Sequence, residues 1–151
     1  MDYIKEAEKY LGSYYDLKRS IKHADYMINK LKWKSCPQNL KAINYDITGI
    51  SVKSVNNTSD EMHQLILWQD IRETNLKAIE HIEKILEAID KEDECLQYKK
   101  VLEMWYIKKM DKVDIALELG YESRKSAYQI RNKALKKFAV SLFGVYVFKA
   151  M

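Results

Sequence analysis

The spacing of apolar residues near the start of this sequence constrains its fold more than any other feature. Apolar side chains recur at alternating steps of four and three residues: Tyr3, Ala7, Tyr10, Tyr14, Leu17, Ile21, Ala24, Ile28 and Leu31. A period of about 3.5 residues places one apolar stripe along a helix of about 40 Å. A lone helix cannot bury such a stripe, so we expect a second helix, from this chain or from another copy, to cover it.

A second long helix is predicted from Glu61 to about Ile89, where apolar residues again follow a helical spacing. Arg72 and Asn75 occupy two central positions of its apolar stripe. Polar residues at such positions either fix the register of paired helices or face solvent where the helices part, and the sequence favours neither interpretation. Between the two helices, turn-forming residues predict a loop over about 34–59.

The composition favours an all-α fold. The chain of 151 residues contains only 4 Gly and 1 Pro, whereas sheet-rich folds need many tight turns that these residues favour. No apolar run reaches the roughly 18 residues of a membrane span, and the charged start does not resemble a signal peptide. The two cysteines are far apart, which suits a reducing compartment. We therefore expect a cytoplasmic protein without a membrane partner.

Charge is distributed unevenly along the chain. Residues 1–94 carry 14 Lys/Arg and 17 Asp/Glu, whereas residues 95–151 carry 12 and 5. A basic C-terminal part beside a mildly acidic body is typical of a protein with a nucleic-acid-binding module. We place the domain boundary in the acidic stretch at 90–94. This predicts a coiled-coil or helical-hairpin module over 1–91 and a DNA-binding domain with an apolar C-terminal tail over 92–151.

The segment 111–138 predicts a helix-turn-helix. A short helix over about Lys112–Leu119 is followed by Gly120, which can adopt the left-handed conformation that ends a helix. Ser123 is a favourable N-cap for the next helix. In the helix-turn-helix plan, this second helix enters the major groove of DNA.

The second helix carries the candidate site. The range Ser123–Phe138 contains six Lys/Arg and no acidic residue. Recognition helices read base edges from their N-terminal turns, with side chains that match the donor and acceptor pattern of the major groove. We expect four residues to read bases: Arg124, Lys125, Tyr128 and Gln129. We expect six others to contact the phosphate backbone: Lys112, Ser126, Arg131, Asn132, Lys133 and Lys136.

The same segment resembles region 4 of sigma-70-type factors. The matching residues are Ile115-Ala116, Leu119-Gly120, Ser123 and Ala134-Leu135-Lys136-Lys137-Phe138. Tyr121-Glu122 makes the turn one residue longer than in the usual sigma pattern, which can rotate the second helix. In its layout the chain is similar to the ArpU/RinA-type phage late-gene regulators, with a helical N-terminal part, a variable loop and a sigma-like helix-turn-helix.

The resemblance implies a sequence-specific transcriptional regulator of phage or prophage late genes, acting on double-stranded DNA in the bacterial host cytoplasm. RNA polymerase is a further candidate partner. If the N-terminal helices pair between chains, the protein is a homo-oligomer, with a dimer favoured, and its target is a repeated or palindromic site. The alternatives are a small terminase-like DNA-packaging subunit and a helical adaptor that binds protein without DNA.

No enzyme, metal or cofactor is expected. The three histidines His23, His63 and His81 have no second histidine at a helical spacing of three or four residues, and a metal site needs convergent ligands. The sequence also lacks a glycine-rich phosphate-binding loop. We expect the apolar tail over 139–151 to pack on the C-terminal domain or on another copy of the chain.

Overall fold

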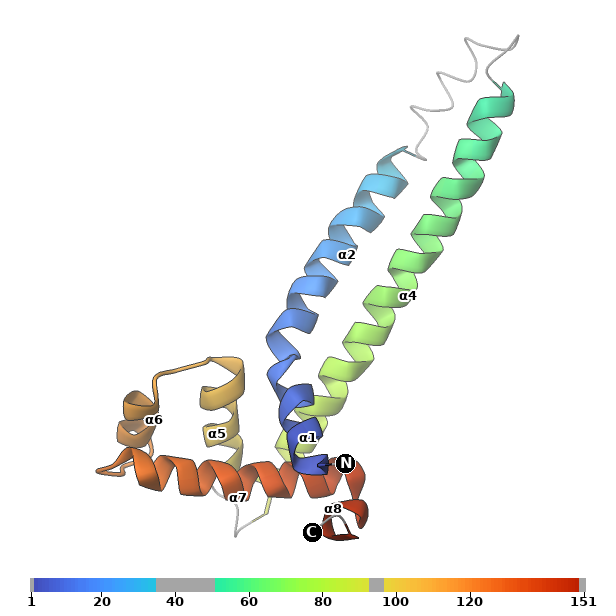
Figure 1. Cartoon of the computed structure of the whole chain (residues 1–151). Helices are drawn as coiled ribbons and strands as arrows, with labels where there is room; N and C mark the ends of the chain where they lie inside the picture. Colours follow the sequence, from blue (N-terminus) through green and yellow to red (C-terminus); the bar gives the residue numbers. More distant parts are fainter. Residues whose placement is uncertain (1, 35–50, 93–96, 150–151) are drawn as a thin grey trace. The chain divides into compact units, whose positions relative to one another are not determined.

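Every regular element in the described part of the chain is a helix. A computed structural model describes residues 2–34, 51–92 and 97–149, with the side chains of 51–59 excluded. These residues contain no strand, so the predicted all-α fold is confirmed. In order along the chain (Figure 1), the helices are α1 (Tyr3–Gly12), α2 (Tyr14–Lys34), α4 (Ser51–Asp90), α5 (Tyr98–Leu102), the π-helical turn η2 (Glu103–Ile107), α6 (Lys112–Glu118), α7 (Arg124–Phe143) and α8 (Tyr146–Lys149). None of the described helices is apolar over the length that a membrane span requires.

The helices belong to two compact units. Unit 1 comprises residues 1–16 and 78–151, and unit 2 comprises residues 17–77. The predicted boundary at residue 91 is therefore wrong, because α1 and the last turns of α4 pack with the C-terminal helices. The apolar side chains that they bury in unit 1 include Ala7, Leu11, Ile82, Leu86 and Ile89. Helical spacing placed Ala7 on the predicted apolar stripe but not Leu11, and it did not show which helix would cover the stripe.

Unit 2 is a helical hairpin in which α2 and α4 lie side by side (Figure 1). Arg72 Nε lies 2.6 Å from Asp25 Oδ1, and Asn75 Nδ2 donates a hydrogen bond of 2.8 Å to Ser20 Oγ. Both polar residues of the α4 stripe thus contact α2, as the register interpretation predicted. The α2 stripe residues Ala24, Ile28 and Leu31 are buried within the single chain. Their burial therefore needs no second copy.

Two predicted element bounds differ from the structure. The helix predicted over residues 3–31 is interrupted at Ser13, whose Oγ donates a 2.6 Å hydrogen bond to the carbonyl oxygen of Tyr10. The loop predicted over 34–59 is wrong for residues 51–59, which form the first turns of α4, while residues 35–50 lie outside the described part. Asn, Thr and Ser have only weakly unfavourable helix propensity, and tertiary context can override it.

The C-terminal helices build most of the core of unit 1. Ile115 of α6, Phe138 of α7 and Leu102 of α5 are fully buried. The small side chains of Ala116 and Ala127 are buried on α6 and α7, which pack against each other. The tail packs in the same unit, as expected: Val147 is buried, and the ring of Tyr3 lies 5.1 Å from that of Phe143.

Candidate nucleic-acid interface

A tight turn joins α6 to α7. Gly120 has a φ of +82°, a conformation that glycine adopts without steric cost. The amide of Tyr121 donates to the carbonyl oxygen of Ala116 at 2.8 Å, and the amide of Gly120 donates to that of Leu117 at 3.1 Å. These two bonds form a Schellman motif, which satisfies carbonyl groups at the end of α6. The turn therefore fixes where α7 begins.

Ser123 occupies the N-cap position of α7, but its side chain does not cap the helix. Its φ of −134° and ψ of 151° are extended, as an N-cap requires. Its Oγ lies 3.3 Å from Ser126 Oγ and makes no hydrogen bond to the first amides of the helix. Ser123 therefore marks the helix start through its backbone conformation.

One exposed stripe runs along α7, and we call it the α7 stripe. Its residues alternate by one and three positions, a spacing that keeps them on one side of a helix: Arg124, Lys125, Tyr128, Gln129, Asn132 and Lys133. All six are exposed, and none is acidic. The stripe includes the four residues predicted to read bases and two of those predicted to contact phosphates. It is a cationic surface with amide and phenol groups between the charges.

Trp105 of η2 lies beneath one edge of the α7 stripe. Its ring meets that of Tyr128 edge to face, with centroids 4.9 Å apart. Lys112 Nζ lies 4.5 Å from the centroid of the same indole. Edge-to-face aromatic contacts and cation–π contacts restrict the side chains that make them. Trp105 therefore positions Tyr128 and Lys112.

The prediction that Arg131 contacts phosphate is not supported by its position. Its side chain is only 17% exposed and lies on the buried side of α7. Its Nη1 donates to Glu8 Oε1 at 3.0 Å and to Tyr106 Oη at 3.1 Å, while Tyr106 Oη donates to the same Glu8 oxygen at 2.9 Å. Burial is the main reason that the pKa of Tyr106 is raised to about 12. Arg131 thus holds α7 to α1 and η2.

The remaining predicted backbone contacts are partly accessible. Lys112, Ser126 and Lys136 are half-buried. Lys136 Nζ lies 5.7 Å from the centroid of the Phe148 ring, so the tail contacts this side chain. A long lysine stem can lie on apolar surface while its ammonium group reaches water. Lys112 and Lys136 can therefore still present their charges to a phosphate at the margin of the α7 stripe.

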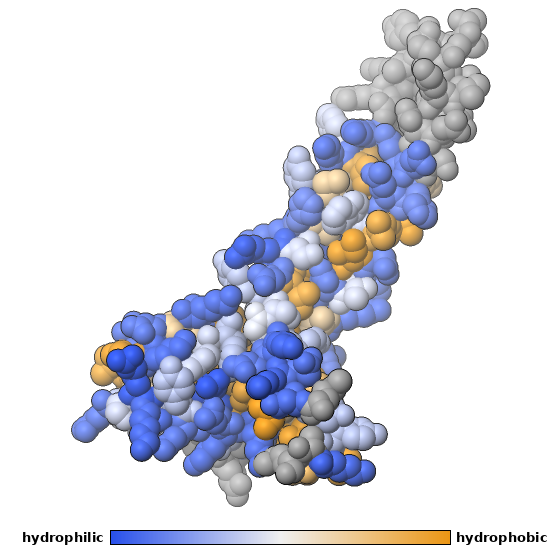
Figure 2. All heavy atoms as spheres, in the orientation of Figure 1, coloured by the Kyte–Doolittle hydropathy of each residue, from blue (hydrophilic) through white to orange (hydrophobic). Residues whose placement is uncertain are grey.

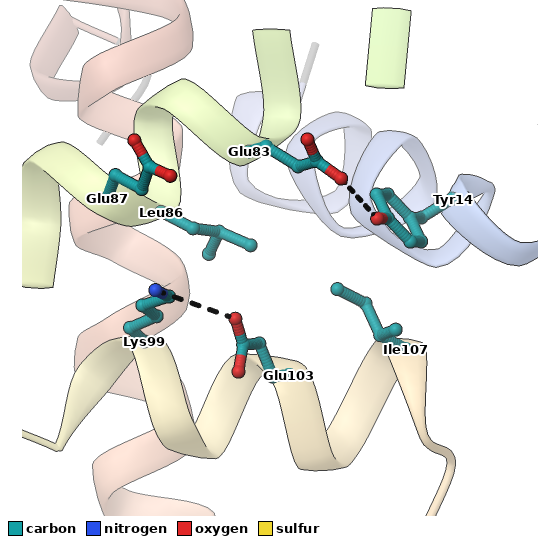
Figure 3. A pocket seen from close by; sticks show the side chains of 7 residues that line it. All are labelled: Tyr14, Glu83, Leu86, Glu87, Lys99, Glu103 and Ile107. Carbon is teal, nitrogen blue, oxygen red and sulfur yellow. Dashed lines mark hydrogen bonds and ion pairs between the residues drawn. The ribbon is translucent and has the colours of Figure 1, made fainter. Parts of the chain in front are cut away.

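Unit 1 also contains an open hollow of about 190 Å³ (Figure 3). Two of the three carboxylates that line it, Glu83 and Glu103, have partners among the described residues. Tyr14 Oη donates to Glu83 Oε1 at 2.5 Å, and Lys99 Nζ lies 4.0 Å from Glu103 Oε1. Within the described residues, no group of three or more His, Cys, Asp or Glu side chains is arranged to hold a metal ion. The hollow therefore gives no indication of a ligand.

The chain matches no protein-family model, no curated protein and no solved structure.

Proposed function

We propose that this protein is a sequence-specific DNA-binding transcriptional regulator that places the α7 stripe in the major groove of double-stranded DNA. The observation that carries the proposal is the α7 stripe itself, an exposed, acid-free helix face that follows the Gly120 turn. The major groove is wide enough for an α-helix, and Arg, Lys, Gln and Asn match its base edges. The resemblance to sigma region 4 and to ArpU/RinA-type regulators supports a role on phage or prophage genes in a bacterial cytoplasm.

The proposed contacts to DNA are of two kinds, contacts to base edges and contacts to phosphates. Arg124, Lys125, Tyr128 and Gln129 lie in the first two turns of α7, where recognition helices reach base edges. The other proposed contacts are to phosphates, which contribute affinity without reading sequence: Lys112, Ser126, Asn132, Lys133 and Lys136. Arg131 is no longer among the proposed phosphate contacts, because it pairs with Glu8 and Tyr106 and positions α7.

Fluorescence polarisation with labelled duplexes tests the proposal. We expect Arg124→Ala and Gln129→Ala to weaken binding to a preferred duplex by roughly 1–3 kcal/mol and to relax selectivity at one base position. Lys136→Ala should weaken binding to all duplexes about equally and make affinity depend less on salt. Lys77→Ala, which alters an exposed lysine of unit 2, is the matched control and should leave binding unchanged.

Two outcomes would assign the chain to another class. Absence of salt-dependent duplex binding would contradict the proposal and favour a helical protein adaptor. Assembly into a ring of many subunits around DNA would favour a small terminase-like packaging subunit.

A homodimer is part of the proposal, with unit 2 as its interface. The α4 side chains Met62, Ile66 and Leu67 are exposed in the single chain although they are large and apolar. Exposed apolar clusters of this kind occur at protein interfaces. We expect sedimentation to give the mass of a dimer for the full chain, and Ile66→Ser to lower it. A monomer at all concentrations would remove the dimer from the proposal.

A further inference from the structure

Acidic residues in the C-terminal part of the chain are concentrated on one short segment. Residues 95–151 contain five Asp/Glu, and four of them fall between residues 111 and 122: Asp111, Asp114, Glu118 and Glu122. The only basic residue within this segment is Lys112. Helix α6 is therefore acidic, whereas α7, which follows it directly, begins with an acid-free basic stretch. DNA phosphates would repel the acidic groups, so the α7 stripe does not explain them.

The outward side of α6 combines these acidic groups with exposed apolar side chains. Leu117 is 67% exposed and Val113 is 43% exposed, while Asp114 and Glu118 are also exposed. Each pair is separated by four residues, so an apolar row and an acidic row run side by side along α6. We call this surface the α6 face. The side chains of the α6 face do not contribute to the core, because α6 packs on unit 1 through Ile115 and Ala116 on its opposite side.

The α6 face is hollowed. Met110, Asp114, Leu117 and Glu118 line an open depression of about 400 Å³. Figure 2 shows hydrophobic surface over α6, bordered by hydrophilic surface. Lys100 Nζ lies 4.0 Å from Glu118 Oε2 and donates to the carbonyl oxygen of Glu118 at 3.4 Å, whereas no ion pair of Asp114 is found among the described residues. The depression is therefore lined by two apolar and two acidic side chains.

We propose that the α6 face docks a basic amphipathic helix of a partner protein. The apolar row fits aliphatic side chains of that helix, and the carboxylates of Asp114 and Glu118 attract Lys or Arg spaced one helical turn apart on it. We infer a basic partner from charge complementarity, because an acidic surface repels nucleic acid and attracts a cationic partner. The inference goes beyond DNA binding, because it gives the chain a contact surface separate from the α7 stripe and from the proposed dimer interface. The surface is small, so we expect weak and reversible docking.

A synthetic helical peptide with leucine and lysine rows at four-residue steps is a suitable probe. We expect its fluorescence polarisation to rise when it is titrated with the full-length wild-type protein, with a Kd on the order of 100 µM. Leu117→Ser and the double variant Asp114→Lys, Glu118→Lys should each weaken binding at least tenfold. Tyr26→Ser and Asp70→Lys, which alter an exposed apolar and an exposed acidic side chain of unit 2 outside the proposed dimer interface, should bind the peptide as the wild type does. A peptide with glutamate in place of lysine should bind only the double lysine variant.

Thermal unfolding followed by circular dichroism verifies that the variants are folded, which we expect because the altered side chains are exposed. Leu117→Ser should retain duplex DNA binding within twofold of the wild type, whereas Arg124→Ala should lose DNA affinity and still bind the peptide. Measuring both duplex binding and peptide binding for these two variants distinguishes a failure of DNA binding from a failure of peptide docking. Equal peptide binding by wild type and Leu117→Ser, or no binding by the wild type, would overturn the inference. A lower sedimentation mass for Leu117→Ser would also overturn it, by showing that a second copy of the chain occupies the face.

Discussion

At the scale of single residues, Arg131 shows what sequence can and cannot predict about this site. The exposed positions of the α7 stripe follow from helical spacing and an acid-free composition. Arg131 has the same residue type and lies in the same basic helix, so the sequence grouped it with the phosphate contacts. Only the fold brings Glu8, 123 positions away, within 3.0 Å of its guanidinium. An arginine that binds DNA and one that binds a carboxylate look alike until that partner is placed.

Tyr106 makes the stability of unit 1 sensitive to alkaline pH. Its pKa is raised to about 12 from the ordinary value of 10.0, chiefly by burial. The corresponding contribution to the free energy of unfolding is complete below pH 10 and is lost as pH rises through 12, by about 2 kcal/mol. Urea unfolding between pH 8 and pH 12 should therefore show a steeper loss of stability for wild type than for Tyr106→Phe. Identical pH dependence of the two proteins would show that Tyr106 does not titrate in this way.

Substitutions at two turn positions with positive φ should change the free energy of unfolding in opposite directions. Lys109 has a φ of +51° and Gly120 a φ of +82°; side chains rarely adopt this region, which glycine reaches without cost. We expect Lys109→Gly to raise the free energy of unfolding by about 0.5–1 kcal/mol and Gly120→Ala to lower it by about 1 kcal/mol. Chemical denaturation measures both. Destabilisation by Lys109→Gly would argue against the left-handed conformation at that position.

At the scale of elements, apolar spacing predicted the helices but not their partners. The same heptad-like spacing continues from α1 into α2, yet α1 packs with α7 in unit 1 while most of α2 pairs with α4 in unit 2. Local spacing specifies which side of a helix is buried. Long-range packing determines which apolar surface covers that side. A single sequence does not show these long-range contacts. For that reason the domain boundary was predicted wrongly while the helix type was predicted correctly.

Leu11 tests whether α1 is part of the fold that presents the α7 stripe. Its side chain is fully buried in unit 1. Leu11→Ala should lower the free energy of unfolding by about 2–5 kcal/mol, because it leaves a cavity in a packed core. Leu117→Ala, at a leucine of α6 that is 67% exposed, is the matched control and should change stability by less than about 0.5 kcal/mol. Equal effects of the two substitutions would show that α1 is not integral to unit 1.

At the scale of the whole molecule, the two units should be separable. Unit 1 has its own core and includes the proposed DNA-binding surface, although it is built from two separate stretches of chain. Replacing residues 17–77 with a short Gly/Ser linker should leave a helical protein that unfolds cooperatively and binds DNA as a monomer. Residues 92–151 alone should not fold stably, because they lack the buried side chains of α1 and α4. Circular dichroism melting of both fragments measures this, and a cooperative transition for 92–151 would contradict the division into units.

Selection from random duplex DNA with the full-length chain tests the central claim most directly. If the α7 stripe reads base edges, the recovered sequences will share a motif, and Gln129→Ala will lose preference at one position within it. A symmetric pair of half-sites would also show that two copies bind together. Recovered duplexes without a common motif, or the same motif from wild type and from a variant with Arg124, Lys125 and Gln129 all changed to alanine, would contradict sequence reading by α7.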